Sequence, residues 1–571
     1  SLVNEDGALT ARPASFARKV SGSYYTHDDP VGLILDEAVG RLVTEKNDTF
    51  SALIQSYETR NTLRPYEWAA IDEADPATQI LDLKICDPAM GSGHFLVALV
   101  DWLASRVLEA IETTEELVNS ERWALHLAER GRPHVSPVVN RIADIRKRIK
   151  TAGEAHGWAL DDRQLDDRHI VRRMILKRVI FGVDKNPMAV ELAKVALWLH
   201  TFTVGAPLSF LDHHLKCGDS LHGEKLDGVR KGMQELGVLF QDAELARLDL
   251  AAKNLDQVAE LTDTSIAEAQ ESKSLADRAA AEVAPIHALL SFWRALRWLV
   301  PGWPTNRLAK IKDETQRAAI AELFSGRYNL AAVAVSGVVD GDTPAVAALN
   351  AMLAQARALA ARETFFHWWT AFPTVWRYGS EADGGFDAVI GNPPWDLLQM
   401  QEVEWFAERK PEIAMQARAA DRKALIAREE KRKTPLWAEF VVASLRSDQE
   451  QRVVRESEDF PLLAEGRSNL AKLFVERSVA LARPNGMIAL LTPSGIAADK
   501  GASEFFRSIT SPQAMDLLGD ERTRLAALYD FENRGNPGGS YFPDVDSRFK
   551  FCAFIFGGSQ RRFNAARCAF F

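Results

Sequence analysis

Phe386–Trp395 is the stretch whose residue types point most directly to chemistry. It reads FDAVIGNPPW, and the pattern predicts a short buried strand followed by a turn that contains Asn392, Pro393, Pro394 and Trp395. Consecutive prolines fix φ and donate no backbone N–H, so the turn is a rigid, extended hook. The Asn392 amide oxygen and the Pro393 carbonyl are two acceptors suited to an exocyclic amino group, and the Trp395 indole offers a face to a planar base. The alternative is an ordinary turn at the end of a core strand.

A second candidate stretch, residues 83–96, combines a strand with a small-residue loop. The strand is predicted to end at Asp87, and a loop with Pro88, Ala89, Gly91 and Gly93 leads into a helix near position 94. Glycines let the backbone approach a ligand closely, and a helix N-terminus presents unpaired N–H groups to an anion. Neither G-x-G-x-x-G nor G-K-[ST] occurs, which disfavours dinucleotide and triphosphate sites.

Two further acids follow predicted strands. Asp184 ends the apolar run 179–184, and Asp219 lies near the end of 215–221. Either acid alone is more often a helix cap than a ligand. Three strand-end acids in succession, with Asp87 as the first, predict a crevice at the carboxyl edge of an α/β sheet, where an acid grips ribose hydroxyls.

The order of these elements predicts an α/β protein interrupted by helices. A chain of 571 residues is long enough for several domains. The predicted organisation begins with an N-terminal helical segment at residues 1–80 and a first half of the sheet at residues 81–221. A helical insertion follows at residues 222–380, and its first part is expected to form an antiparallel hairpin. The second half of the sheet is predicted at residues 381–571.

Composition limits the class of protein. The net charge is −10, so any nucleic-acid surface must be local or supplied by a partner. A basic cluster between Arg418 and Lys433 is interleaved with acids, which favours a solvated helix face over a DNA surface. The four cysteines have no metal-ligand spacing, so we expect no metal and a reducing cytoplasm. No membrane span is predicted. The termini, Ser1 and Phe571, suggest a fragment that stops before a target-recognition domain.

Taken together, the motifs resemble a known family. The ordered set YYT (24–26), DPAMGSGHF (87–95), GVDKNP (182–187), CGDSL (217–221), IGNPPW (390–395) and DSRFKF (546–551) resembles DNA adenine-N6 methyltransferases. The similarity is to those of large restriction–modification and phage-defence systems such as BREX and DISARM, and it covers roughly residues 20–556. His27 stands where the family usually has proline after YYT.

The resemblance implies a Rossmann-like sheet of seven strands, with the last antiparallel, that binds S-adenosylmethionine and methylates double-stranded DNA. It implies that Tyr24 and Thr26 lie against the cofactor. Asp87, Pro88, Ala89, Gly91 and Gly93 would hold its methionine portion, Asp184 its ribose and Asp219 its adenine. Asn392 and Pro393, followed by Pro394 and Trp395, would receive the target adenine, with Phe549 or Phe551 on its other face. Other defence-system subunits are expected partners.

Two other functions fit some of the same residues. Methyltransferases that act on RNA or protein amides also use NPP-aromatic turns, but YYT, the insertion and the aromatic loop favour DNA adenine. A subunit that only senses the cofactor and depends on partners for activity is the other alternative, against which the intact motif at 392–395 argues. No nuclease motif is recognisable in residues 1–80, so cleavage by this segment is not expected.

Overall fold

The computed structural model describes twelve segments of the chain: residues 2–5, 8–11, 26–60, 62–155, 165–238, 242–304, 310–376, 384–465, 469–511, 522–534, 540–542 and 545–571. Tyr24 lies outside these segments, so its predicted contact with a cofactor stays a prediction. Among the described helices, none has both the length and the apolar character needed to cross a bilayer.

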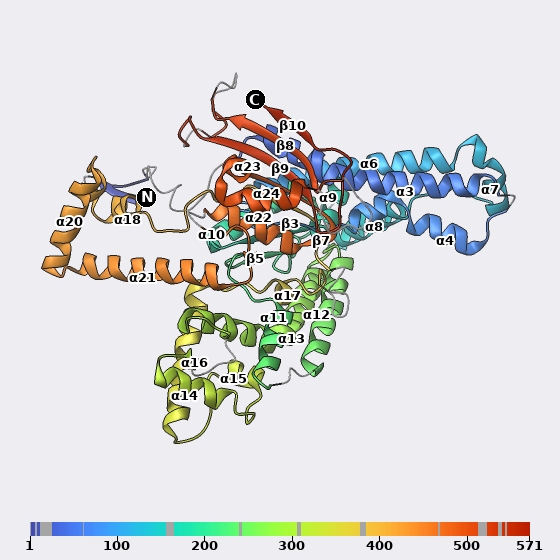
Figure 1. The fold of residues 1–571 in the computed structure, drawn as a ribbon. Coiled ribbons are helices and arrows are strands. Elements are labelled where there is room, and N and C mark those ends of the chain that lie inside the picture. The colour runs from blue at the N-terminus through green and yellow to red at the C-terminus, as the bar shows by residue number, and fades with distance from the viewer. Residues whose placement is uncertain are drawn as a thin grey trace.

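A single eight-stranded sheet forms the centre of the molecule (Figure 1). Its order is β10-β8-β9-β7-β6-β3-β4-β5. The strands are β3 (Ile85–Asp87), β4 (Ile180–Asp184), β5 (Leu215–Cys217), β6 (Phe386–Gly391), β7 (Ala482–Pro493), β8 (Leu525–Glu532), β9 (Lys550–Gly557) and β10 (Arg567–Phe570). Only β9 runs antiparallel to its neighbours, and the pairs β3–β4, β3–β6, β4–β5 and β6–β7 are parallel.

The expected number of seven strands is wrong by one. The seven expected strands are present, but the chain continues into β10, which pairs in parallel with β8. β9 is therefore the last strand but one. A strand of four residues carries little periodicity, although its position at an edge has a physical reason, because it pairs backbone groups of β8 that would otherwise form an open edge.

Helices cover both faces of the sheet. Along β7, Met487, Ala489 and Leu491 belong to one core, whereas Ile488 and Leu490 belong to the other. This alternation follows from the period of two in a strand that is buried on both sides. The first core contains α2 (Asp28–Ile34), a π-helical turn (Leu35–Val39), α3 (Gly40–Glu58), α5 (Pro76–Leu81), α6 (His94–Val118), α8 (Pro137–Ala155), α9 (Asp167–Arg178) and α10 (Pro187–His200). Opposite lie α17 (Trp368–Ala371), α22 (Leu470–Leu481), α23 (Gly495–Ala498) and α24 (Ser503–Thr510).

Three helical projections leave the sheet (Figure 1). Parts of α3, α6 and α8, with α4 (Pro65–Glu73) and α7 (Ala124–Arg130), form the one at the right of the view. The helices α2 to α5 lie between residues 28 and 81, within the segment predicted to be helical, and a hairpin of β1 (Leu2–Glu5) and β2 (Ala8–Ala11) precedes them. A second projection, named the arm here, comprises residues 397–469 with α18 (Glu402–Arg409), α19 (Pro411–Ala414), α20 (Ala419–Arg432) and α21 (Pro435–Glu456).

The third projection is the predicted helical insertion. Its helices are α11 (Leu226–Glu235), α12 (Asp242–Glu260), α13 (Ile266–Leu299), α14 (Glu314–Leu323), α15 (Leu330–Ser336) and α16 (Pro344–Glu363). α12 and α13 form the expected antiparallel hairpin. Near its open end Arg247 is 3.4 Å from Glu282, and at its turn the Thr264 N–H donates to Glu268.

A buried ion pair fastens this hairpin to α9. Lys177 on α9 lies 2.9 Å from Asp263 in the turn between α12 and α13, and both side chains are fully buried. Asp263 also accepts hydrogen bonds from the Phe210 N–H and the Ser272 hydroxyl. Burial lowers the pKa of Lys177, while the Asp263 charge opposes this shift. The ammonium therefore depends on Asp263 to remain charged inside the protein.

We expect Asp263→Asn to destabilise the fold by about 3–5 kcal/mol, because it keeps the shape of the side chain but leaves a buried ammonium without its anion. Urea denaturation measures this loss. Glu109→Gln is the matched control, since it removes an exposed partner of Arg106 and should cost less than about 1 kcal/mol. Equal effects of the two substitutions would contradict a stabilising role for the buried pair.

Candidate active site

The predicted site residues meet at one edge of the sheet. β7, β6, β3, β4 and β5 are consecutive parallel neighbours, so their carboxyl ends lie on the same side. Asp87 ends β3, Asp184 ends β4, Asn392 follows β6, and Asp219 follows β5 by two residues. A crevice of this kind outside the carboxyl ends is where open α/β sheets bind ligands.

Asp87 is an almost fully buried carboxylate, with 1% of its surface exposed. Its Oδ1 accepts a hydrogen bond of 3.0 Å from the Ala89 N–H. Burial raises the pKa of Asp87 to about 7; the Asp184 charge adds to the rise and the Ala89 N–H opposes it. No described Lys, Arg or His lies within ion-pair distance of it. A cation at this position would therefore be strongly favoured.

The loop after β3 holds its backbone open toward the crevice. Met90 packs over Gly182 of β4, and the Met90 N–H donates to the Val183 carbonyl. Gly91 has a φ of +55°, and a Cβ on it would meet no atom within 4 Å. Gly93 has a φ of +85°, directly precedes α6, and packs so closely on Ala193 that a Cβ would lie 3.0 Å from the alanine Cβ. The predicted strand, loop and helix are confirmed here.

Pro88 and Ala89 occupy the base of this loop. The Pro88 carbonyl accepts a 2.6 Å hydrogen bond from the Ser220 hydroxyl, which ties the loop to the segment after β5. Ala89 packs against a separate apolar cluster that includes Leu221 and Leu473.

Asp184 is bound to the loop through its carboxylate. Its Oδ2 accepts from the Gly91 N–H at 2.9 Å, and its Oδ1 accepts from the Asn186 N–H at 2.8 Å. Burial raises the pKa of Asp184, and these two backbone donors oppose the shift. Asp184 thus shapes the glycine loop and, at the same time, places a carboxylate beside it.

Asp219 is already engaged with the protein on both oxygens. Lys185 donates to its Oδ2 at 2.7 Å and the Leu221 N–H donates to its Oδ1 at 3.0 Å. Burial alone would raise the pKa of Asp219, but the neighbouring His222 and Lys185 side chains, together with these hydrogen bonds, hold it at about 2. Asp219 therefore remains ionised at any physiological pH.

Asp219, His222 and Glu450 also carry potential metal-ligand atoms within 4.8 Å of one another. His222 Nε2 lies 3.1 Å from Glu450, and its Nδ1 lies 2.9 Å from the Arg294 guanidinium. Lys185 pairs with Asp219, and Arg294 donates to His222. These two cationic side chains already offset the two carboxylates of the group. It is best described as an ion-paired network that joins the segment after β5 to α13 and α21.

Asn392 directly follows the glycine that packs against Asp87. Gly391 has a φ of +150°, and a Cβ on it would lie 2.6 Å from Asp87 Oδ1, so only glycine allows this approach of β6 to β3. The Asn392 Nδ2 donates to Thr26 Oγ1 at 3.1 Å. Its Oδ1 is buried and has no hydrogen-bond partner among the described residues. Thr26, itself 4% exposed, contacts Asn392 and so links the YYT motif to this turn.

The turn continues through Pro393, which is buried, and Pro394, which is half-buried, to Trp395. The Trp395 indole donates to the Leu491 carbonyl at 3.3 Å and packs edge-on against Phe542 at a centroid distance of 5.0 Å. Trp395 is half-buried. Phe551 is fully buried behind it at 6.0 Å, whereas Phe549 is 53% exposed. Of the two phenylalanines, only Phe549 offers its ring to a ligand from solvent.

Three neighbours of these residues were not expected from the sequence: Gly391, Lys185 and Phe542. Gly391 lies within the quoted motif, but its contact with Asp87 depends on strand order. Lys185 follows Asp184 directly, and its pairing with Asp219 depends on the β4–β5 neighbourhood. Phe542 belongs to an aromatic pair in a long loop, and this pair was the feature of the sequence that could have pointed to it as a neighbour of the site.

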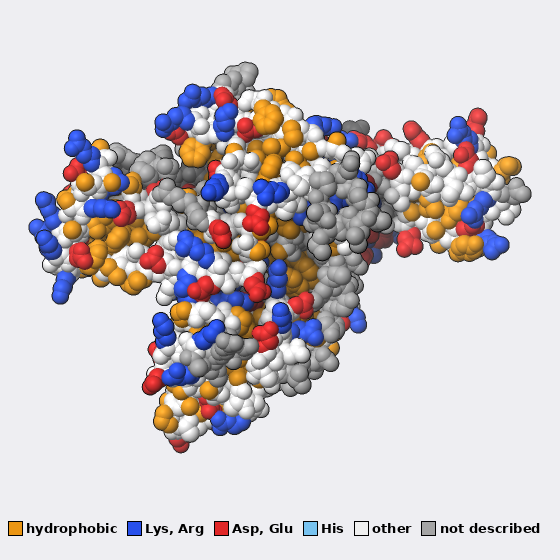
Figure 2. Space-filling model, viewed as in Figure 1, with side chains coloured by type: hydrophobic (Ala, Val, Ile, Leu, Met, Phe, Trp, Pro, Cys, Tyr) orange, Lys and Arg blue, Asp and Glu red, His pale blue; other side chains and the backbone are white. Residues whose placement is uncertain are grey.

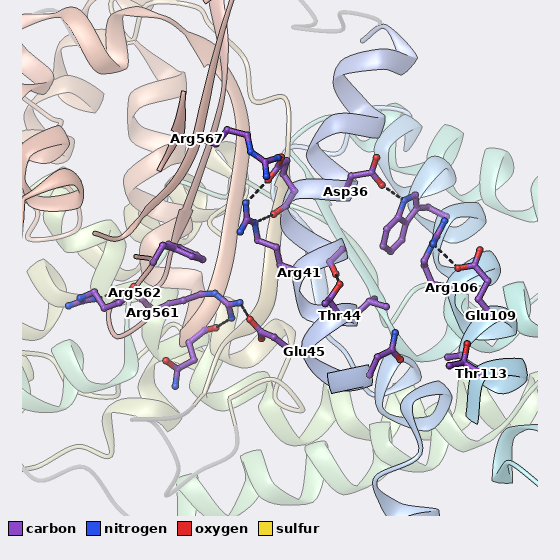
Figure 3. A pocket seen from close by; sticks show the side chains of 18 of the residues that line it. Asp36, Arg41, Thr44, Glu45, Arg106, Glu109, Thr113, Arg561, Arg562 and Arg567 are labelled. Carbon is purple, nitrogen blue, oxygen red and sulfur yellow. Dashed lines mark hydrogen bonds and ion pairs between the residues drawn. The ribbon is translucent and has the colours of Figure 1, made fainter. Parts of the chain in front are cut away.

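A large hollow lies elsewhere (Figure 3). It has a volume of about 1010 Å³ and is lined by α3, α6 and the segments beside β10. Four of its arginines pair with acids of the same hollow: Arg41 and Arg567 with Glu37, Arg106 with Glu109, and Arg561 with Glu45. None of the predicted site residues lines it.

Two solved structures share features with the chain. The DrdV–DNA complex, determined by cryo-electron microscopy, is 9% identical with a TM-score of 0.32, covering 97% of this chain and 28% of that chain. A protein described as a class I S-adenosylmethionine-dependent methyltransferase from Listeria monocytogenes is 11% identical with a TM-score of 0.18, covering 60% and 93%. Both scores are too low to carry an argument. This chain spans less than a third of the DrdV chain.

No curated protein matches the chain. Residues 178–521 match the family described as Eco57I restriction-modification methylase. The matched range includes Asp184, Asp219 and the turn at 392–395. Since it covers more than half of the 571 residues, the chain belongs to the Eco57I restriction-modification methylase family.

Proposed function

We propose that this protein methylates the N6 amino group of adenine in double-stranded DNA with S-adenosylmethionine, after the base has been flipped out of the helix. It would be the modification component of a restriction–modification or phage-defence system of the BREX or DISARM type. The observation that carries the proposal is the buried Asn392 Oδ1, which has no described hydrogen-bond partner and lies on a turn packed against Asp87.

The residues at the crevice fit S-adenosylmethionine. Its ammonium would offset the buried Asp87 carboxylate, and the open side of Gly91 leaves room for its methionine portion. Asp184 is the carboxylate for its ribose and Asp219 the acceptor for its adenine amino group. When bound, it supplies an electrophilic methyl group on a sulfonium. In this proposal residues 81–221 provide the cofactor half and residues 381–571 the catalytic half.

Asn392 and Pro393 would act on the target amino group. The lone pair of an adenine amino nitrogen is delocalised into the ring, so the nitrogen is a poor nucleophile. The Asn392 Oδ1 and the Pro393 carbonyl, which accept hydrogen bonds from its two N–H groups, favour a more tetrahedral nitrogen with a localised lone pair. Because these acceptors are held by two prolines, little reorganisation is needed as charge develops. Thr26 orients the Asn392 amide by accepting from its Nδ2.

An extruded base needs a flat receptor. Trp395 borders the turn, and its ring is fixed from behind by Phe542 and Phe551. The exposed Phe549 ring lies in the same β8–β9 connection as Phe542, directly before β9. We assign Trp395 and Phe549 to the two faces of the base, while Phe551 acts as the support of Trp395.

Asn392→Ala should lower the rate of methyl transfer to duplex DNA by about 10²–10³-fold or more, because it removes an acceptor aligned with the reacting nitrogen. Cofactor affinity and melting temperature should stay close to those of the parent protein. Asn485→Ala, at an exposed position of β7, is the matched control and should be fully active. A joint loss of stability, cofactor binding and activity in Asn392→Ala would instead identify the turn as scaffold.

Cofactor affinity should rise with pH between about 6 and 8. In the free protein the pKa of Asp87 is about 7, and a bound ammonium favours the ionised carboxylate. Binding below pH 7 must therefore expel a proton, and the dissociation constant should increase by up to about tenfold for each pH unit below 7. Isothermal titration calorimetry with S-adenosylmethionine measures this dependence.

Two substitutions separate this effect from other titrations. Asp87→Asn should weaken binding at pH 8 and abolish the pH dependence. Asp219→Asn should leave the dependence intact, because the pKa of Asp219 is about 2 and the group does not titrate in this range. An unchanged pH profile in Asp87→Asn would exclude Asp87 as the partner of the ammonium.

A further inference from the structure

The arm begins and ends beside the catalytic turn. The chain leaves the sheet at Trp395 and returns at Asn469, where α22 begins. Leu397 and Asn469 form an antiparallel bridge, and the Leu470 N–H donates to the Asp396 carbonyl at 2.8 Å. Both ends of the arm are therefore closed against each other within a few residues of Asn392. The base of the arm therefore borders the catalytic turn.

The arm is a rigid structure with its own core. Phe406, Ile413 and Ile426 are buried together, and Trp405, Trp437 and Phe440 pack around them. At its base, Arg446 on α21 donates to Glu363 at 2.7 Å, and Arg452 donates to the Trp298 carbonyl at 2.7 Å. α21 is thus anchored on the helical insertion at one end and supports α18 and α20 at the other.

The outer part of the arm is strongly basic. Residues 409–433 contain nine Lys and Arg against four Asp and Glu, a net charge of +5 in a chain whose net charge is −10. One of the four acids, Glu429, is buried and points inward, where it accepts from Lys410 and Thr434. With this pair set aside, eight cations remain against three acids, so the interleaved acids do not neutralise this segment.

Six cations of this segment, Arg418, Lys423, Arg428, Lys431, Arg432 and Lys433, are exposed. Within the part of the chain that the structure describes, none has a carboxylate within ion-pair distance. Figure 2 shows Lys and Arg side chains gathered at this end of the arm, at the left of the view. The hollow in Figure 3 differs from the arm in the pairing of its cations. Its residues Arg41, Arg106, Arg561 and Arg567 are each paired with an acid.

We propose that the outer face of α20 binds the phosphate backbone of the DNA duplex whose adenine enters the crevice. This inference rests on the proposed function and extends it to a surface outside the site. Exposed, unpaired point charges on a rigid support bind phosphates through counterion release and carry no sequence information. They also repel one another in the free protein, and a polyanion removes that repulsion.

Arg428, Lys431 and Arg432 define the test, because positions i, i+3 and i+4 share one face of α20. A variant with all three changed to Gln is compared with a matched control in which Arg122, Arg132 and Lys147 are changed to Gln. These control cations are also exposed but lie on the projection that contains α4, α7 and α8. Both variants lose three positive charges, so a difference between them is local rather than due to net charge.

Fluorescence anisotropy with a labelled duplex, between 50 and 200 mM salt, gives affinity and salt slope. If all three residues contact phosphates, the slope of log affinity against log salt falls by about 2.7 in magnitude. The parent protein then loses roughly 40-fold more affinity than the α20 variant across this range. The control variant should keep the parent slope, and S-adenosylmethionine binding should be unchanged in both.

The outcomes distinguish this inference from the proposed function. Asn392→Ala should retain the full salt slope while failing to transfer methyl groups. A protein that binds duplex DNA through α20 but never methylates it would contradict the proposed function and support phosphate binding by the arm. Equal slopes for the α20 variant and its control would overturn the inference, as expected if the arm instead docks an acidic protein. A lower turnover number of the α20 variant at saturating DNA would overturn it too, because phosphate contacts affect capture.

Discussion

The approach of Gly391 to the buried Asp87 carboxylate is the constraint on which the site depends. The two residues belong to the two halves of the sheet and are separated in sequence by the whole helical insertion. A side chain at position 391 would occupy the space of the Asp87 oxygens. The residues assigned to the cofactor and those assigned to the target base are therefore positioned by one backbone contact between β3 and β6.

This contact requires the insertion to return the chain to a defined place. Buried ion pairs fix the position of the insertion. Lys177 and Asp263 join α9 to the α12–α13 turn, and Arg294 on α13 lies 3.3 Å from Glu224 and 3.2 Å from Asp459. Buried charges add less net stability than apolar contacts of the same size, but an unpaired partner is strongly penalised. These buried ion pairs therefore restrict the position in which the insertion can pack against the rest of the protein, and they add little to its net stability.

The strands and the motifs at their ends could be predicted because both signals are local. Five-residue apolar runs, glycines before a helix and the two prolines at 393 and 394 all act within a few residues. The partners of these motifs depend on strand order, so the contacts of Thr26 with Asn392 and of Lys185 with Asp219 could not be predicted. The same limit explains why Phe549 and Phe551 were equivalent candidates in the sequence, although one is exposed and the other is buried.

The arm shows most clearly why charge patterns along a sequence are ambiguous. Acids and bases alternate between positions 409 and 433, and the pattern alone favours a neutral, solvated face. In the fold, Glu429 turns into the arm, whereas the cations around it turn outward. Which of two interleaved charges reaches solvent depends on where the hydrophobic side chains Phe406, Ile413 and Ile426 form their core.

The length of α21 sets a scale for the proposed DNA substrate. Its 22 residues span about 33 Å at 1.5 Å per residue. A duplex rises by about 3.4 Å per base pair, so the distance from the base of the arm to α20 corresponds to about ten base pairs, or one helical turn. Under the proposed function, short duplexes that end near the target base on this side would not reach the basic face. The footprint of the protein on DNA would accordingly be asymmetric about the modified base.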